Sequence, residues 1–185
     1  MKISLNPLRK SFAAALCIAS AGSLFAQAQV CPSTIERTRP DSRYEAVAAA
    51  TPAGSEVRDK VTGLIWKRCL EGATWSGTAC TGTVSTFTWV NALDRARTAT
   101  ATSASPATAW RLPNRNELQS LAEIACNNPA INSTWFPNQP NTSAWSASPN
   151  SDVLDGAWVV VFYDGFGGYG FKDNGLSARL VRSGQ

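Results

Sequence analysis

The sequence predicts an exported α+β domain, rich in loops and stapled by disulfides, in which two short helices pack on an antiparallel β-sheet. Three observations support this prediction. A processing segment opens the chain, an even number of cysteines follows it, and short helical and strand periods alternate with loops rich in Gly, Pro, Ser and Thr. The loops outweigh the regular periods, so we expect disulfides to support the core.

Residues 1–28 have the composition of a secretory signal peptide. Three basic residues precede an apolar stretch at positions 12–25, and Ala26-Gln27-Ala28 matches a cleavage site. The apolar stretch is short for a membrane span, although an uncleaved anchor is the competing interpretation. We therefore expect a secreted or periplasmic protein cleaved after Ala28, with no transmembrane segment in the remainder.

Removal of this segment changes the charge of the chain. The full sequence has 17 basic and 13 acidic residues, a net charge of +4. Three of the basic residues lie within positions 1–28, so 14 remain against 13 acidic residues, and the net charge falls to about +1. A basic surface that would indicate nucleic-acid binding is absent. The remaining length suits one domain with a single core.

Four cysteines remain after cleavage, and three pairings are possible. Cys69 and Cys80 bracket a Gly-rich loop, which favours a local bridge between them. That choice pairs Cys31 with Cys126, so that the N-terminal segment is joined to the end of a predicted helix. A four-cysteine zinc site is the alternative, but no C-x-x-C pair is present.

The first half of the chain contains an arm, a hairpin and a helix. Residues 29–54 are polar or small and form the expected N-terminal arm, and residues 55–185 form the domain. Strands at Glu56–Asp59 and at 64–66 are joined by a turn. Residues 70–87 are expected to be an irregular loop. Trp89, Ala92, Leu93 and Ala96 then recur at helical spacing, so a helix is predicted from about residue 88 to 96, followed by an exposed loop at 98–108.

The second helix begins in the stretch Trp110–Leu118. Pro113 disfavours helix before it, Asn114 is a suitable N-cap, and Glu117 completes a capping box. The helix is predicted from about Arg115 to Ile124. Its apolar positions are Leu118, Leu121, Ala122 and Ala125, and its polar side carries Arg115, Asn116, Gln119 and Glu123.

The C-terminal third predicts a β-meander. Strands are expected at 144–148, 157–163, 166–172 and 177–182, with turns at Asp164-Gly165 and at 173–175. Alternation places Phe162 and Tyr163 on opposite faces, so that Tyr163 points outward if Phe162 points inward.

Several ordered motifs resemble the Lcl C-terminal domain family, named for the end of a collagen-like adhesin. They are the Trp-Arg-Leu-Pro-x-x-x-Glu-Leu-x-x-Leu run from Trp110, the segment Asn128–Asn132, and Ala144-Trp145-Ser146-Ala147-Ser148. The resemblance covers roughly Glu56 to Gly184. It implies a C-type-lectin-like fold, similar to that of formylglycine-generating enzymes. The reactive thiols of those enzymes have no counterpart here, because no Cys follows Cys126.

Catalytic constellations are missing from the sequence. The chain has no His, which removes the commonest general base and the usual metal ligand. Glu117 is explained as a cap, and the remaining candidate acids stand in predicted turns or on the polar side of the helix: Glu123, Asp152, Asp155, Asp164 and Asp173. We therefore expect a protein that is not an enzyme.

No cofactor is expected either. Calcium could use the oxygens of Asp152 with Asp155, or of Asp173 with Asn174, but neither pair matches a spaced calcium loop. Turn formation is the simpler explanation of these residues.

The sequence predicts a binding patch on the outer face of the C-terminal sheet. Most of the seven Trp residues are assigned to the core. The last two strands and their turns combine aromatic, Gly and polar residues, which suits a ligand-binding surface. Its candidate residues are Tyr163, Asp164, Phe166, Tyr169, Lys172 and Asn174, with Phe171 beside them. The competing interpretation places Phe166 and Phe171 in the core.

We expect a secreted, non-catalytic module that recognises a glycan or surface polymer, as the adhesin resemblance implies. The alternative is a protein-binding or structural module of the envelope without glycan specificity. The expected partner is thus a glycan or an extracellular or envelope protein, and not a nucleic acid. The sequence contains no collagen-like or coiled-coil segment that would set an oligomeric state.

Overall fold

The computed structural model describes residues 29–101 and 109–184. The predicted signal peptide and residues 102–108 of the predicted loop lie outside them. Within these two ranges the chain is an α+β domain with two α-helices, a 3-10 turn at Asp41–Arg43, three antiparallel sheets and two disulfides. None of the described helices has the length and apolar character needed to cross a bilayer.

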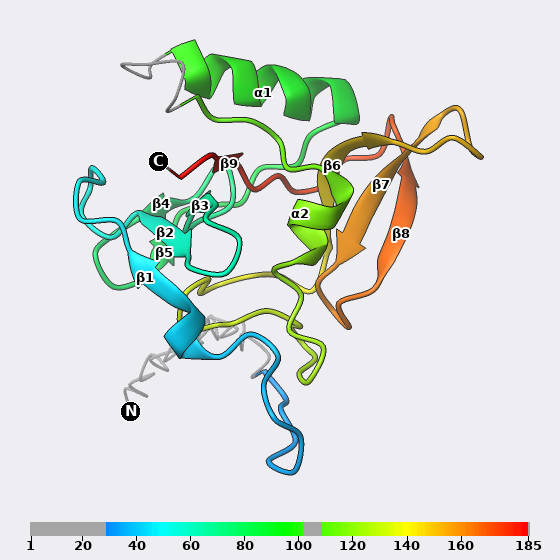
Figure 1. Ribbon diagram of the computed structural model, residues 1–185. Helices are drawn as coiled ribbons and strands as arrows, with labels where there is room; N and C mark the ends of the chain where they lie inside the picture. The colour runs from blue at the N-terminus through cyan, green and yellow to red at the C-terminus, as the bar shows by residue number, and fades with distance from the viewer. Residues whose placement is uncertain (1–28, 102–108, 185) are drawn as a thin grey trace, which may run out of the picture.

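The first sheet has the strand order β1–β2–β3–β9 (Figure 1). Its strands are β1 (Tyr44–Ala46), β2 (Glu56–Asp59), β3 (Ile65–Lys67) and β9 (Val181–Arg182). The expected hairpin is present as β2 and β3. Two predictions about its neighbours were wrong. The arm contributes β1, and the last strand joins β3 and not the C-terminal meander, because alternation predicts a strand without specifying its partner.

The second sheet is the expected meander of β6 (Ser143–Pro149), β7 (Gly156–Val161) and β8 (Gly167–Phe171). Phe162 is fully buried and Tyr163 is exposed, as the alternation predicted. A third sheet was missed. Its strands β4 (Thr74–Trp75) and β5 (Cys80–Thr81) form a small hairpin inside the loop expected at 70–87.

Helix α1 (Trp89–Ala101) is longer than predicted. Ala92, Ala96 and Ala99 are all buried, so the apolar stripe continues into the segment expected to be a loop. The Ala/Thr composition hid this stripe because alanine carries a weak hydrophobic signal.

Helix α2 (Arg115–Gln119) is shorter than predicted. Its capping box forms as expected: the Asn114 side chain accepts the Glu117 N–H at 2.9 Å, and the Glu117 carboxylate accepts the Asn114 N–H at 2.8 Å. The chain leaves the helix at Ser120, and Leu121 and Ala122 still reach the core.

Two hydrophobic clusters fill the two faces of the second sheet. One joins Trp66, Leu118 and Val160, and the other joins the alanines of α1 to Trp145 and Val159. Helix α2 lies between the two larger sheets, and α1 lies across the end of the molecule (Figure 1). Strand β7 is therefore packed on both faces, and β8 is left at the side of the domain.

Both predicted disulfides are present, Cys31–Cys126 and Cys69–Cys80. The arm is also held by Glu123, which was expected on the polar side of a helix but is fully buried. Its carboxylate accepts the Thr38 N–H at 2.9 Å, the Thr38 hydroxyl at 2.8 Å and the Arg39 N–H at 2.6 Å. The early end of α2 allows this orientation. Burial alone would raise the pKa of Glu123, but the hydrogen bonds from Thr38, Arg39 and Ala125 lower it below its ordinary value.

Candidate functional site

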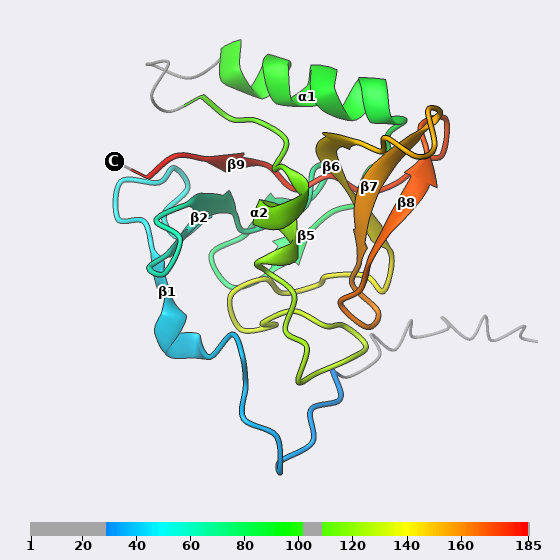
Figure 2. The same cartoon turned by 45° about the vertical axis from the view of Figure 1, so that its right-hand side comes forward.

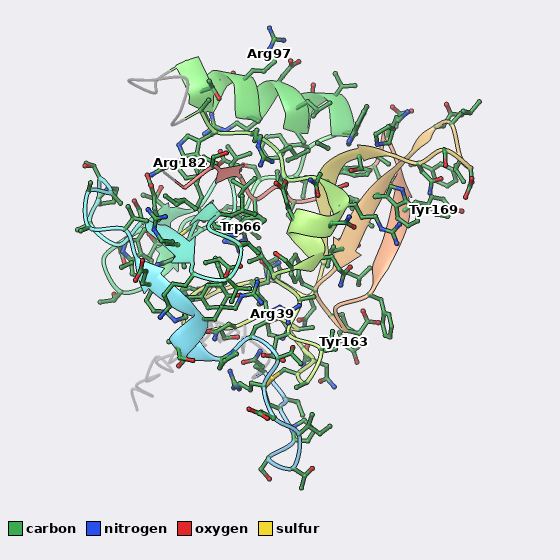
Figure 3. The ribbon with its side chains drawn as sticks, in the orientation of Figure 1. Arg39, Trp66, Arg97, Tyr163, Tyr169 and Arg182 are labelled. Atoms are coloured by element: carbon green, nitrogen blue, oxygen red, sulfur yellow. A yellow bond between two sulfur atoms is a disulfide. The ribbon has the colours of Figure 1, made fainter. Side chains whose placement is uncertain are left out.

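Four large aromatic side chains of the β7–β8 hairpin are more than half exposed. The exposed fractions are 72% for Phe166, 54% for Phe171, 53% for Tyr163 and 51% for Tyr169. Phe166 and Phe171 therefore lie at the surface, and the interpretation that placed them in the core was wrong. Tyr163 and Tyr169 lie on the side of the molecule away from Trp66 and Arg182 of the first sheet (Figure 3).

Trp158, Tyr169 and Phe171 share one face of the second sheet. Trp158 of β7 stands opposite Tyr169 of β8 in the register, and Phe171 follows Tyr169 by two residues. The rings of Tyr169 and Phe171 meet edge to face with centroids 5.9 Å apart. We call these three residues the aromatic face.

Helix α2 borders the aromatic face and supplies its positive charge. The Arg115 guanidinium lies 3.6 Å from the centroid of the Trp158 ring, a cation–π contact. A side chain at Gly167 would meet the Gln119 Oε1 at 3.1 Å, so α2 lies directly above this part of β8. The face thus places a guanidinium and an amide beside exposed aromatic carbon.

Helix α2 is held against the second sheet by hydrogen bonds to other elements, and these fix the backbone of Arg115. The Arg115 N–H donates to the Ser148 hydroxyl at 3.0 Å, and the Gln119 amide donates to the Gly165 carbonyl at 2.6 Å. Arg111 forms two 2.7 Å hydrogen bonds to Glu117. Burial alone would raise the pKa of Glu117, but Arg111 and the Asn114 N–H lower it below its ordinary value. Glu117 is therefore an ionised structural group.

The opposite face of β8 is closed by core side chains. A side chain at Gly170 would meet the Trp145 ring at 3.0 Å and Leu176 at 3.1 Å, so any larger residue here would force these neighbours to shift. Gly165 in the turn has φ +83°, which glycine adopts at little cost. The Gly-rich sequence thus allows close packing behind β8, and the front face stays exposed.

The structure separates the six predicted site residues into two groups. Tyr163, Asp164, Phe166 and Tyr169 lie on the hairpin, where Asp164 accepts the Phe166 N–H at 3.1 Å and so shapes the turn. Lys172 points away from the aromatic face, with its Nζ 5.1 Å from the Trp89 ring and 2.6 Å from the Leu154 carbonyl oxygen. Asn174 lies in the turn after β8 and donates its N–H to Phe171.

Sequence reasoning missed two members of this site. Trp158 was assigned to the core because it shares the alternation of Val160 and Phe162, yet it is only partly buried. Arg115 was placed on a solvated helix side. The position of Arg115 in the first turn of a helix was the available sequence signal. The strand on which this helix packs could not be inferred from the sequence.

A second feature is a polar hollow of about 410 Å³ between α1, the first sheet and the Cys69–Cys80 loop. Its charged groups bind one another: the buried Glu71 accepts Lys67 at 2.9 Å and Arg95 at 2.5 Å. The charged side chains of Glu71, Lys67 and Arg95 are therefore occupied with one another and are less available to a ligand in the hollow.

The predicted calcium oxygens lie in turns. Asn150 accepts the N–H groups of Asp152 and Val153 at 2.8 and 3.1 Å and so shapes the β6–β7 loop. Among the residues that the structure describes, no three His, Cys, Asp or Glu side chains gather as a metal site.

The sequence was compared with protein families, curated proteins and solved structures. Residues 55–182 match the Lcl C-terminal domain. No curated protein and no solved structure gave a significant match. The matched range begins just before β2 and ends at β9, so it contains both larger sheets except β1, both helices and the aromatic face. The chain belongs to the Lcl C-terminal domain family.

Proposed function

We propose that this domain is a secreted, non-catalytic binding module that recognises a glycan or surface polymer through its aromatic face. The family points to an adhesin-like module, and the two disulfides fit an extracellular or envelope location. The observation that carries the proposal is the exposure of Tyr169 and Phe171 on a strand whose opposite side packs against Trp145 and Leu176 at Gly170. A C-type-lectin-like fold is part of the same proposal.

The chemistry of the aromatic face suits a sugar. A sugar ring presents C–H groups on one side and hydroxyl groups around its edge. Aromatic rings provide apolar contact for the C–H side, and Arg115 and Gln119 provide hydrogen-bond donors and an acceptor for the hydroxyls. Because the sheet and α2 are fixed before binding, little conformational entropy is lost when a ligand is held.

The alternative is recognition of an envelope protein by the same face. Tyr, Trp and Arg are the residues that dominate the energetics of protein interfaces. The aromatic face contains a Tyr and a Trp, and Arg115 borders it. Competition with a free oligosaccharide distinguishes the two functions. The oligosaccharide displaces a bound glycan but leaves a protein partner bound.

A glycan array probed with the oxidised protein tests the proposal, together with capture from envelope extracts. We expect array binding that weakens by about tenfold, or roughly 1.4 kcal/mol, in Tyr169→Ala and Phe171→Ala. Val61→Ser is the matched control, because Val61 is 73% exposed in the β2–β3 turn. An array without signal, combined with protein capture that depends on Tyr169, would establish the alternative instead.

A further inference from the structure

Strand β8 is a free edge of the second sheet. Among the strands in residues 29–101 and 109–184 it pairs with β7 alone, and in Figure 2 it is the outermost strand of its sheet. The opposite edge is covered, since Trp145 donates its N–H to Ser177 at 2.9 Å and Ser177 donates to Ser143. Natural edges are usually protected by Lys, Pro or a bulge, and residues 167–171 contain none of these.

The hydrogen-bond pattern shows which backbone groups face outward. Val161 donates its N–H to the Phe166 carbonyl at 2.9 Å, and Lys172 donates to Asp155 at 2.8 Å. The register between these two bonds is unbroken, and hydrogen-bonded pairs alternate along an antiparallel ladder. Gly167, Tyr169 and Phe171 therefore direct their N–H and C=O groups away from β7.

We propose that this edge pairs with β8 of a second copy of the chain, antiparallel about a two-fold axis at Tyr169. This register brings all three outward-directed residues opposite a partner. The Phe171 carbonyl already accepts the Asn174 N–H at 2.8 Å, and its second lone pair is the acceptor for the Gly167 N–H of the second copy. It places Tyr169 opposite Tyr169, and Gly167 opposite Phe171 of the second copy. Each Phe171 ring then lies across from Gly167, which has no side chain of its own and is bordered by Gln119 and Arg115 of helix α2. The strand is complementary to itself, as a two-fold interface requires.

The pairing doubles the aromatic face, and this consequence rests on the proposed function. Residues that pair across strands point to the same side of a sheet. The second copy therefore contributes its own Tyr169 and Phe171 to one continuous strip, bordered on both sides by α2 helices carrying Arg115. A polymer that spans the strip contacts both copies, which raises its affinity through multivalency.

The edge is short, so the dimer is weak. An interface of one five-residue strand and its rings is smaller than the roughly 1,600 Å² of a standard stable interface. We therefore expect a monomer–dimer equilibrium that depends on protein concentration. A substitution of one side chain at the interface should be enough to shift it.

Sedimentation equilibrium of the oxidised protein without ligand tests the register. Tyr169→Lys and Tyr169→Glu each place two like charges directly opposite each other, which is unfavourable, so each variant alone is expected to be a monomer. An equimolar mixture pairs Lys with Glu and is expected to restore the dimer. Leu154→Lys, at a loop position that is 81% exposed, is the control and should dimerise as the unmodified chain does.

The outcomes separate this inference from the proposed function. A protein that stays monomeric up to its solubility limit would overturn the dimer, as would a dimer that both single variants retain or a mixture that stays monomeric. Each of these outcomes leaves glycan binding by a monomer intact. A restored dimer together with a silent glycan array would support the edge pairing and refute the proposed ligand.

Discussion

The N-terminal arm and the β7–β8 hairpin both lie at the surface, but their side chains are engaged in opposite ways. In the arm, Thr38 and Arg39 bind Glu123, and Arg43 binds the buried Asp59 at 2.8 and 2.5 Å. In the hairpin, Tyr169 and Phe171 touch each other and remain half exposed. The arm therefore contributes to stability, whereas the hairpin keeps apolar surface available for a partner.

The arm and the hairpin do not differ in how firmly their backbones are held. The hairpin is held at its base, where Gln119 binds the Gly165 carbonyl and Gly165 packs against Ala122 and Ala130. These contacts fix the backbone without covering the rings. Substitutions in the arm should therefore lower the free energy of unfolding, and substitutions on the aromatic face should lower affinity.

The largest effect is expected for the double substitution Cys31→Ala/Cys126→Ala. The disulfide closes a loop of 95 residues, for which chain entropy predicts a loss of roughly 4.5 kcal/mol. The 11-residue separation of Cys69 and Cys80 predicts a smaller loss, below about 3 kcal/mol. Denaturation in guanidinium measures both. The account of the arm would be contradicted if the long-range pair mattered less than the local one.

A loss of about 3 kcal/mol is expected for Asp59→Asn, because Arg43 is then left in a buried site without its carboxylate. The Asp94–Arg97 pair is the control. Its side chains are 57% and 84% exposed, so Asp94→Asn should change stability by less than about 1 kcal/mol. Urea denaturation of the two variants gives the comparison, and equal losses would contradict the assignment of Asp59 as a structural anchor.

The pH dependence of stability tests the Glu123 contact. The pKa of this carboxyl is lower in the folded protein than its ordinary value of 4.5. Its contribution is therefore complete above that value and is lost as the pH falls through the folded pKa. Melting curves should show that the unmodified protein loses more stability on acidification than Glu123→Gln does. Parallel curves for the two proteins would show that the arm does not depend on this charge.

The smallest effect on stability is expected for Tyr169→Ala and Phe171→Ala. Both side chains are half exposed, so each substitution should change the free energy of unfolding by less than about 1 kcal/mol. Phe162→Ala, which empties a fully buried position in the adjacent segment, should cost about 3–5 kcal/mol. Thermal melts measure the difference. Large losses in the free energy of unfolding for both variants would show that the aromatic face serves stability and not binding.

The sequence was sufficient to predict the elements with strong local signals. The capping box at Asn114 and Glu117, the β7–β8 hairpin, and the inward Phe162 with the outward Tyr163 follow from local spacing. Both disulfides also follow, because a short loop selects one pair and leaves the other. Helix lengths were less accurate, since Ala99 extends a stripe of weak hydrophobicity and Ser120 ends α2 without a strong stop signal.

The parts that depend on distant contacts could not be predicted. Val181 pairs with Trp66 across the chain, and Glu123 is turned inward by an arm more than eighty residues earlier. The candidate site shows the same limit. Tyr169 and Phe166 were identified from composition. Lys172 points to the opposite side of the sheet from Phe171, because a one-residue step along a strand reverses the direction of a side chain. Arg115 was missed because its contact with Trp158 joins two elements.

The most direct measurement is NMR mapping of the indole N–H signals during titration with an oligosaccharide selected on the array. The account predicts that the Trp158 signal shifts with ligand and that the signal of Trp110, which lines the polar hollow, does not. Tyr169→Ala should weaken the response of Trp158. If Trp110 shifts while Trp158 stays unchanged, the ligand binds beside Trp110 and the aromatic face is not the recognition surface.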